Sequence, residues 1–181
     1  MTRTEAMAVL KENCTNKNLM KHMLATEAVM AGLAERLGED VGSWSMAGLV
    51  HDLDYDETAS DPGRHGLVSA EKLEAMGFPE DIVHAVKAHN DHAPRESRMD
   101  RALYASDPVT GLVVAAALMH PTKKLASVDV DFVMRRFGEK RFAAGANREQ
   151  IKTVSDLGIP LEEFLGIAIE SMKKVSGDLG L

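Results

Sequence analysis

The amino-acid sequence predicts an all-α fold, and three observations support this prediction. Apolar residues recur every three or four positions along most of the chain, as they do between Leu19 and Leu37. No stretch alternates polar and apolar residues with the period of two that is typical of strands. Glycine and proline divide the apolar pattern into segments of helical length. The 181 residues, 45% of them hydrophobic, suffice for one large core, so we expect a single domain over residues 1–181.

Four predicted helices make up the first half of the chain, over residues 18–37, 44–50, 64–76 and 80–89. Gly38 ends the first of them, and the dipeptide Gly42-Ser43 precedes the apolar run of the second. The turn Asp61-Pro62-Gly63 opens the third helix, because proline is tolerated in a first helical turn. Gly77-Phe78-Pro79 then separates the third helix from the fourth.

The second half begins with the longest apolar stretch, over residues 101–119. The pair Asp107-Pro108 interrupts this stretch, so we expect a central buried helix there rather than a membrane span. Three shorter helices are predicted beyond His120-Pro121, over residues 129–137, 148–155 and 160–174.

Composition and charge narrow the classes of partner and compartment. The formal net charge is −7, which argues against the clustered Lys and Arg of a nucleic-acid-binding surface, so we expect no nucleic-acid partner. The only cysteine, Cys14, excludes an intramolecular disulfide and a thiolate metal cage, and it fits a reducing compartment. No signal-type or membrane-spanning segment is evident, so we expect a cytoplasmic protein with no membrane partner.

A set of histidines and aspartates interrupts the apolar pattern where burial is predicted. His51-Asp52 directly follows the apolar run 46–50, and Asp107 lies inside the long apolar helix. A buried imidazole or carboxylate is costly unless paired, and a divalent transition metal binds both donor types together. With His22, these residues lie on three predicted helices that a bundle can bring to one point. Alternatively, His51 is a hydrogen-bonded core histidine and Asp52 ends a helix.

Two further histidines extend this metal site. His65 and His89 each lie on another predicted helix, where they would supply ligands to a second ion beside the first. The alternative is that each is an exposed polar position on its helix.

The spacing of these six residues resembles the HD superfamily of metal-dependent phosphohydrolases, and His51-Asp52-Leu53-Asp54 resembles its HDIG-type branch. The ligand pattern covers about residues 18–120, which leaves about 121–181 as a C-terminal helical extension. Within that extension, residues 136–148 are similar to a subgroup of bacteria and archaea known as predicted HD-superfamily hydrolases. The resemblance implies an HD-domain helical bundle with additional C-terminal helices.

The resemblance also implies roles for the ligands. The primary metal would be bound by the residues that match the motif, namely His22, His51, Asp52 and Asp107. Members with two metals add two histidines, here His65 and His89, and use Asp52 to bridge the ions. This chain departs from many of those members, because Asp54-Tyr55 stands where they have Gly-Lys, and Asn90 follows His89 where a second histidine is common.

The function that follows is hydrolysis of a nucleotide or other small phosphate ester by a metal-activated water. The cofactor would be one or two divalent ions, with Mn, Fe, Mg, Ni and Zn all compatible with mixed nitrogen and oxygen ligands. Two alternatives remain: a di-iron oxygenase, as in the HD-domain relative myo-inositol oxygenase, and a non-catalytic module that senses a nucleotide. A homodimer is also left open.

Residues near the ligands are candidates for catalysis and substrate binding. We predict catalytic roles for Asp52, for Asp54 and for Lys87, which lies two residues before His89. Asp54 would act as a proton donor from an acidic, lid-like loop over residues 54–62, in which Asp56 and Glu57 are the alternative donors. The cations Arg64, Lys123 and Arg148 would bind substrate phosphate. For each cation the alternative is an ordinary solvated charge, and Asn147-Arg148 also reads as a capped helix start.

Overall fold

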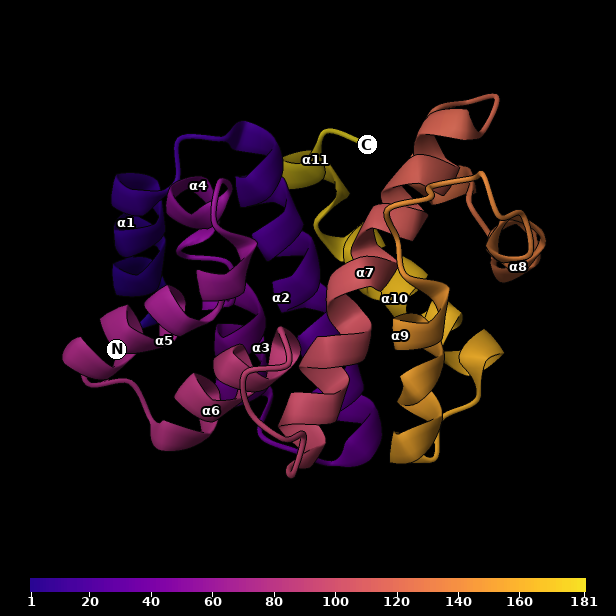
Figure 1. Ribbon diagram of the computed structural model, residues 1–181. Helices are drawn as coiled ribbons and strands as arrows, with labels where there is room; N and C mark the ends of the chain where they lie inside the picture. Colours follow the sequence, from indigo (N-terminus) through magenta and orange to yellow (C-terminus); the bar gives the residue numbers. More distant parts are fainter.

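The computed structural model describes residues 1–181 and confirms the all-α fold (Figure 1). It contains eleven α-helices, three 3₁₀ helices and no strand. The α-helices are α1 (Arg3–Asn13), α2 (Lys17–Leu37), α3 (Val41–Val50), α4 (Tyr55–Thr58), α5 (Leu67–Ala75), α6 (Glu80–His89), α7 (Arg98–Met119), α8 (Val130–Phe137), α9 (Arg148–Lys152), α10 (Leu161–Lys174) and α11 (Ser176–Leu179). The 3₁₀ helices are η1 (Pro62–Arg64), η2 (Leu125–Ser127) and η3 (Thr153–Leu157).

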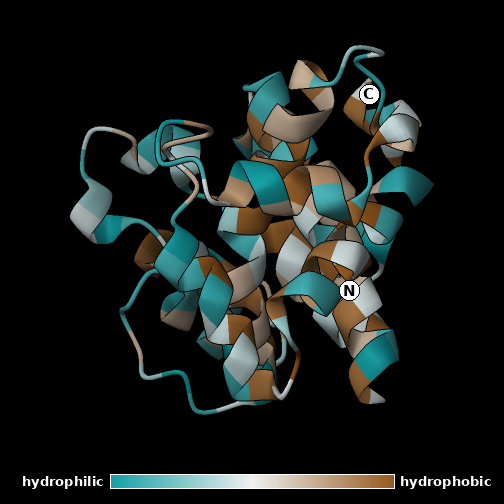
Figure 2. Cartoon of the chain, turned by 90° about the vertical axis from the view of Figure 1, so that its right-hand side faces the viewer, coloured by the Kyte–Doolittle hydropathy of each residue, from teal (hydrophilic) through white to brown (hydrophobic).

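The two longest helices, α2 and α7, pack against each other at the centre of the molecule (Figure 1). Helix α3 packs on α2, and α6 packs on both α3 and α7. On the other side, α8, α9 and α10 cover α7. The loops and outward helix faces are mostly hydrophilic in Figure 2, whereas hydrophobic residues gather between the helices. One cluster of buried apolar side chains connects the helices of residues 19–117 with those that follow.

Helices α2 and α3 touch through their backbones. A Cβ atom added at Gly48 would lie 2.7 Å from the carbonyl oxygen of Thr26 and 2.9 Å from the backbone nitrogen of Glu27. Only glycine fits at such a separation without moving one of the helices. This contact fixes the C-terminal end of α3 against the middle of α2.

Helix α7 continues through Pro108 without a break. Proline lacks a backbone N–H, so the carbonyl of Tyr104, four residues earlier, loses its intrahelical partner. The side-chain amide of Gln150, in α9, donates to that carbonyl at 2.8 Å. A residue of the C-terminal region therefore satisfies the hydrogen bond that Pro108 removes.

By length and hydropathy α7 is also the one helix that could cross a membrane. However, 56% of its most apolar window is buried inside the protein, and α2, α6, α9 and α10 pack against it. This is the environment of a central core helix, as its sequence predicts.

The elements differ from the sequence prediction in several places. The short helices α4 and α11 were not predicted, α3 already begins at Val41 and so includes Gly42-Ser43, and α7 begins at Arg98. Helix α1 was not predicted, because only Ala6 and Leu10 of its eleven residues are buried and its apolar pattern is weak. The helix predicted over 64–76 begins at Leu67, since η1 and Gly66, with φ of +83°, precede it. The segment predicted as one helix over 148–155 is α9 followed by η3.

Candidate metal centre

Four histidines and two aspartates from five parts of the chain meet beside the contact of α2, α3 and α7. The six residues are His22 in α2, His51 and Asp52 just after α3, His65 just before α5, His89 at the end of α6 and Asp107 in α7. The structure thus brings together all six residues whose spacing suggested a metal site.

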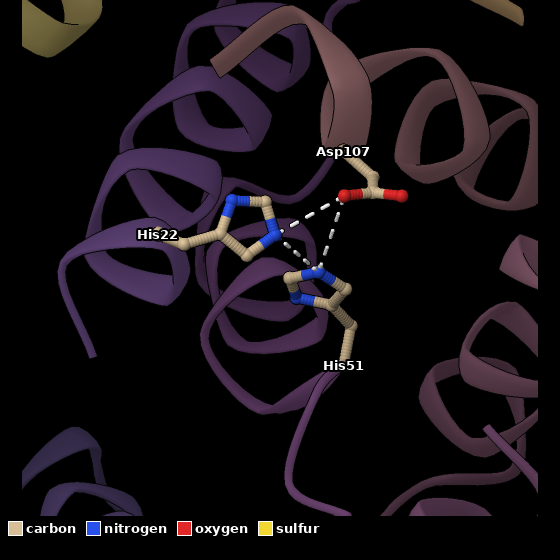
Figure 3. Close-up of side chains that lie close together, drawn as sticks. All are labelled: His22, His51 and Asp107. Atoms are coloured by element: carbon tan, nitrogen blue, oxygen red, sulfur yellow. Dashed lines mark hydrogen bonds and ion pairs between the residues drawn. The ribbon is translucent and has the colours of Figure 1, made fainter. Parts of the chain in front are cut away.

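The first group consists of His22, His51 and Asp107 (Figure 3). The Nε2 atoms of His22 and His51 are 3.2 Å apart. Asp107 Oδ1 lies 3.1 Å from Nε2 of His22 and 3.9 Å from Nε2 of His51. Figure 3 shows the three side chains converging from separate helices. Donor atoms this close together from two imidazoles and a carboxylate can hold one transition-metal ion.

The second group consists of His65 and His89, with Asp52 between them and the first group. Nε2 of His65 and Nε2 of His89 are 3.3 Å apart. Asp52 Oδ1 lies 3.3 Å from Nε2 of His65 and 3.5 Å from Nε2 of His89. The other oxygen, Oδ2, lies 3.4 Å from Nε2 of His22. Oδ1 is also 3.3 Å from Nε2 of His51. Because Asp52 lies within 3.5 Å of members of both histidine pairs, it occupies the position of a bridging carboxylate.

Two of the imidazoles are oriented by their own helices. Nδ1 of His51 donates to the carbonyl of Gly48 at 2.9 Å, and Nδ1 of His89 donates to the carbonyl of Val86. Both acceptors lie three residues earlier, among the carbonyls that a helix end leaves without an intrahelical partner. The bond places the Nδ1 proton and leaves Nε2 with its lone pair toward the centre.

The other two imidazoles depend on side chains from elsewhere. Nδ1 of His22 donates to the hydroxyl of Thr110 at 2.9 Å, and that hydroxyl in turn donates to the carbonyl of Asp107. Nδ1 of His65 donates to Oδ1 of Asp54 at 2.8 Å. These bonds also direct Nε2 to the centre, so all four rings present the same nitrogen.

This arrangement fits a cation. Nε2 atoms that lie only 3.2 and 3.3 Å apart need a positive charge between them. A bound cation would supply it. Without a cation a proton does so, because the neighbouring carboxylates raise the pKa of His22 and of His65 despite their burial. In addition, Asp52 Oδ1 is buried and has no hydrogen-bond partner. A buried, unpartnered carboxylate oxygen is costly unless a positive charge compensates for it.

The electrostatics of the cluster also favour positive charge at its centre. Burial, aided by the nearby His22 and His89, outweighs the aspartates and lowers the pKa of His51 to about 4, so this ring is neutral at pH 7. Burial also acts to lower the pKa of His65, but Asp52 and Asp54 outweigh it and raise the value to about 10. Burial opposes the charge of Asp52, yet the surrounding histidines hold its pKa well below the usual value. Ionised carboxylates and imidazole nitrogens are the donors that a divalent ion requires.

A cleft of about 480 Å³ opens over this cluster, within the size range of small-molecule sites. Apart from Leu19, its remaining lining carries polar groups. These come from residues that the sequence analysis did not assign to a site, namely Asn16, Asn18, Tyr55, Asn90, Asp91, Tyr104 and Gln150. No lysine or arginine lines it. One signal in the sequence bears on the polar lining residues. Pro108 leaves the carbonyl of Tyr104 without a helical partner, so some side chain must donate to it, but the sequence does not say which one.

The structure does not bring Lys87 or Arg148 to this cleft. Lys87 is two residues from His89, about 200° around α6, and its ammonium pairs with Glu74 at 2.8 Å. The guanidinium of Arg148 is engaged by the preceding loop, where it donates to carbonyls of Phe142, Ala143 and Ala146. Arg148 therefore holds that loop together.

Neither of the other two predicted phosphate-binding cations lines the cleft. Arg64 is exposed at the end of η1. Lys123 is exposed in the turn after α7, and the helix alone separates it from Asp107 by about 18 Å.

Asp54 has a different role from the predicted proton donor. It is fully buried, and its carboxylate accepts from Nδ1 of His65 and from the backbone N–H groups of Gly66 and Ser69 at 2.8 to 2.9 Å. Burial acts to raise its pKa, but His65 and the N–H of Ser69 reverse this and keep the pKa below the usual value. An ionised carboxylate with three donors orients His65 and has no proton to give.

The acidic segment 54–62 is not a free loop either. Part of it forms α4. Asp56 accepts from the backbone N–H of Thr15 at 2.8 Å, and Glu57 pairs with Lys72 at 2.8 Å. These bonds attach the segment to the helices around it, in contrast to the lid that its charge suggested.

Comparison with known proteins agrees with this site. The family model described as the HD domain matches residues 19–117. Ribonuclease Y of Geobacter sulfurreducens is 27% identical over 91% of this chain and 32% of that protein. Ribonuclease Y of Pelobacter propionicus is 27% identical over 90% of the chain and 32% of that protein. Ribonuclease Y of Nitratidesulfovibrio vulgaris is 29% identical over 53% of the chain and 18% of that protein.

The chain spans less than a third of the length of each of these relatives. No solved structure matches it significantly. The family model covers more than half of the chain and contains all six converging residues. The chain therefore belongs to the HD-domain family of metal-dependent phosphohydrolases.

Proposed function

We propose that this protein hydrolyses a small phosphate ester, such as a nucleotide, with one or two divalent ions bound by the six-residue cluster. The observation that carries the proposal is the convergence of four Nε2 atoms on an ionised, buried Asp52 without another partner for Oδ1. A divalent ion bound there supplies Lewis acidity and lowers the pKa of a bound water toward neutrality.

The protein's own residues would prepare this chemistry. The cluster orients its nitrogen donors in advance, because each ring donates its Nδ1 proton elsewhere. Asp52 faces both histidine pairs, which supports a two-ion site. In the cleft, the amides of Asn18, Asn90 and Gln150 and the hydroxyl of Tyr55 provide neutral groups that can bind phosphoryl or leaving-group oxygens.

The absence of lysine and arginine from the cleft lining bears on the size and charge of the expected substrate. Phosphate charge would be met chiefly by bound metal, which favours a compact ester over a long polyanion. The net charge of −7 also disfavours a polynucleotide. The absence of a nucleic-acid partner therefore remains our prediction.

A second candidate is cleavage of a phosphodiester in RNA. It is favoured by the similarity over 90% of the chain to a protein named Ribonuclease Y. Both candidates use the same metal chemistry and differ in the size and charge of the substrate.

The test combines metal analysis with a substrate screen. Purified protein is analysed for bound metal, then assayed with nucleotides, sugar phosphates and a short single-stranded RNA, with His51→Ala and Asp52→Ala as controls. Metal-dependent phosphate release that both substitutions abolish is the expected result. RNA cleavage without release from small esters would favour the second candidate. Two irons per chain with oxygen uptake and no hydrolysis would identify the oxygenase alternative.

A further inference from the structure

A second cavity, of about 430 Å³, adjoins the metal cleft. It lies between α2, α7 and the C-terminal turn that contains α11. Asn18 and His22 line both cavities, so the ring that belongs to the metal cluster also forms a wall of this second space. We call this second space the side groove. The metal cleft and the side groove therefore meet at these two side chains.

The lining of the side groove is aliphatic, unlike that of the cleft. Its apolar side chains are Ala25, Val114, Leu118, Leu179 and Leu181. Leu118 is 54% exposed although it is a large apolar residue. Aliphatic surface gathered in a concave site gains free energy when an apolar group displaces its water. No aromatic residue lines the groove, so it offers no platform for stacking a nucleobase.

The side groove also contains the cation that the metal cleft lacks. Lys21 precedes His22 in α2, is half-buried, and lines the groove. It takes part in none of the ion pairs of the structure. An unpaired ammonium beside an apolar space suits a ligand that is anionic at one end and apolar at the other.

Gly111 keeps the side groove open. It lies in the middle of α7, where alanine would favour the helix by a factor of about five. Neither a positive φ nor close packing requires glycine here, because an added Cβ would find no heavy atom within 4 Å. Gly48, in contrast, is required by its contact with Thr26. The free space at Gly111 belongs to the groove that this residue lines.

We propose that the side groove is a specificity subsite for an aliphatic group attached to the phosphate, and that Lys21 pairs with an anionic oxygen of the same substrate. This inference rests on the proposed function, because the metal cleft must hold the phosphate end. The substrate class is then an aliphatic phosphate ester whose hydrocarbon part extends past His22 along α2 and α7.

The experiment uses alkylphosphonates, whose P–C bond is not hydrolysed. Calorimetric titration of the metal-loaded protein compares methylphosphonate with octylphosphonate. We expect octylphosphonate to bind at least about tenfold more tightly, since burial of a few methylene groups suffices for that difference. Gly111→Leu should remove the preference and leave methylphosphonate binding unchanged. Lys21→Gln should leave binding of both phosphonates unchanged. It should weaken binding of a phosphonoalkanoate, whose carboxylate lies in the side groove, by about threefold or more.

The matched control is Gly145→Leu, at a glycine that also has no atom within 4 Å of an added Cβ but lies outside the groove. It should leave both affinities unchanged. Equal binding of the two phosphonates to the wild type would overturn the subsite, even if small esters are hydrolysed. Conversely, a preference for octylphosphonate that Gly111→Leu removes would support the subsite even if no tested ester is hydrolysed. A shift from dimer to monomer in Gly111→Leu on ultracentrifugation, without a chain-length preference, would identify the groove as a dimer contact instead.

Discussion

Each histidine pair of the metal centre joins two rings that are held in different ways. His51 and His89 donate to carbonyls of their own helices, and their side chains are 0% and 1% exposed. His22 and His65 donate to side chains of other segments and are 24% and 16% exposed. One ring of each pair is therefore fixed by local helix geometry, and the other by tertiary contacts.

This difference indicates which imidazole rings a single substitution can reorient. A ring fixed by its own helix moves only if the helix moves, so no single side-chain substitution in another element releases its Nδ1 proton. A ring held by Thr110 or Asp54 loses its orientation when that one partner changes. Metal affinity is accordingly expected to respond to substitutions in a definite order.

The largest effect is expected from Asp52→Ala, because Asp52 is the only residue whose oxygens face both pairs. The metal content should fall to background, and the rate of metal-dependent phosphate release should fall by at least about a hundredfold. This loss exceeds the one expected when a hydrogen-bond partner of a ligand is removed. Elemental analysis and the phosphate assay measure both. A variant that retains full metal and activity would contradict the bridging position of Asp52.

Asp54→Asn should have the next largest effect, through His65. The amide lacks the negative charge by which Asp54 helps to raise the pKa of His65. It also has one acceptor oxygen instead of two for the three groups that donate to Asp54, namely Nδ1 of His65 and the N–H groups of Gly66 and Ser69. Metal affinity should fall about 10- to 100-fold, as measured by competition with a chromophoric chelator. Asp56→Asn, in the same segment but bonded to Thr15, is the matched control and should leave affinity unchanged.

Thr110→Val should reduce metal affinity by a smaller amount, through His22. The substitution preserves shape but removes the neutral hydroxyl that accepts from His22. Hydrogen bonds to charged acceptors are about twice as strong as neutral ones, so we expect a loss of affinity of about tenfold, less than for Asp54→Asn. The same chelator competition ranks the metal affinities of the two variants. A larger loss in Thr110→Val than in Asp54→Asn would show that the charge of the acceptor does not determine how strongly it supports the ring.

Lys87→Gln should have the smallest effect. Its ammonium pairs with the exposed Glu74 and does not line the cleft. Such surface pairs contribute about 0 to 1 kcal/mol, so thermal stability should change little and metal affinity should not change. A tenfold loss of phosphate release in this variant would show that Lys87 reaches the substrate after all.

The sequence was informative about His51-Asp52 and Asp107 because they place polar groups in an apolar helical pattern. The other three histidines were recognised through the spacing that resembles the HD superfamily. It was less informative about the cleft, because Tyr104 and Gln150 meet only after α9 packs on α7. Nearness in sequence did not identify cations at the metal site. A helix turns about 100° per residue, so Lys87, two residues before His89, lies on another side of α6. The role of Asp54 depends on the fold of residues 54–69, which periodicity does not describe.

The backbone contact at Gly48 bears on the selectivity of the site among ions. It fixes the end of α3 against α2, and the carbonyl of this same residue accepts from His51. The spacing between the donors of His22 and His51 is thus set by two main chains in contact. A larger or smaller ion must then be accommodated by the ring of His22, which only the hydroxyl of Thr110 holds, because separating the two main chains would break their packing. Discrimination by size is then a property of the helix packing as well as of the ligands.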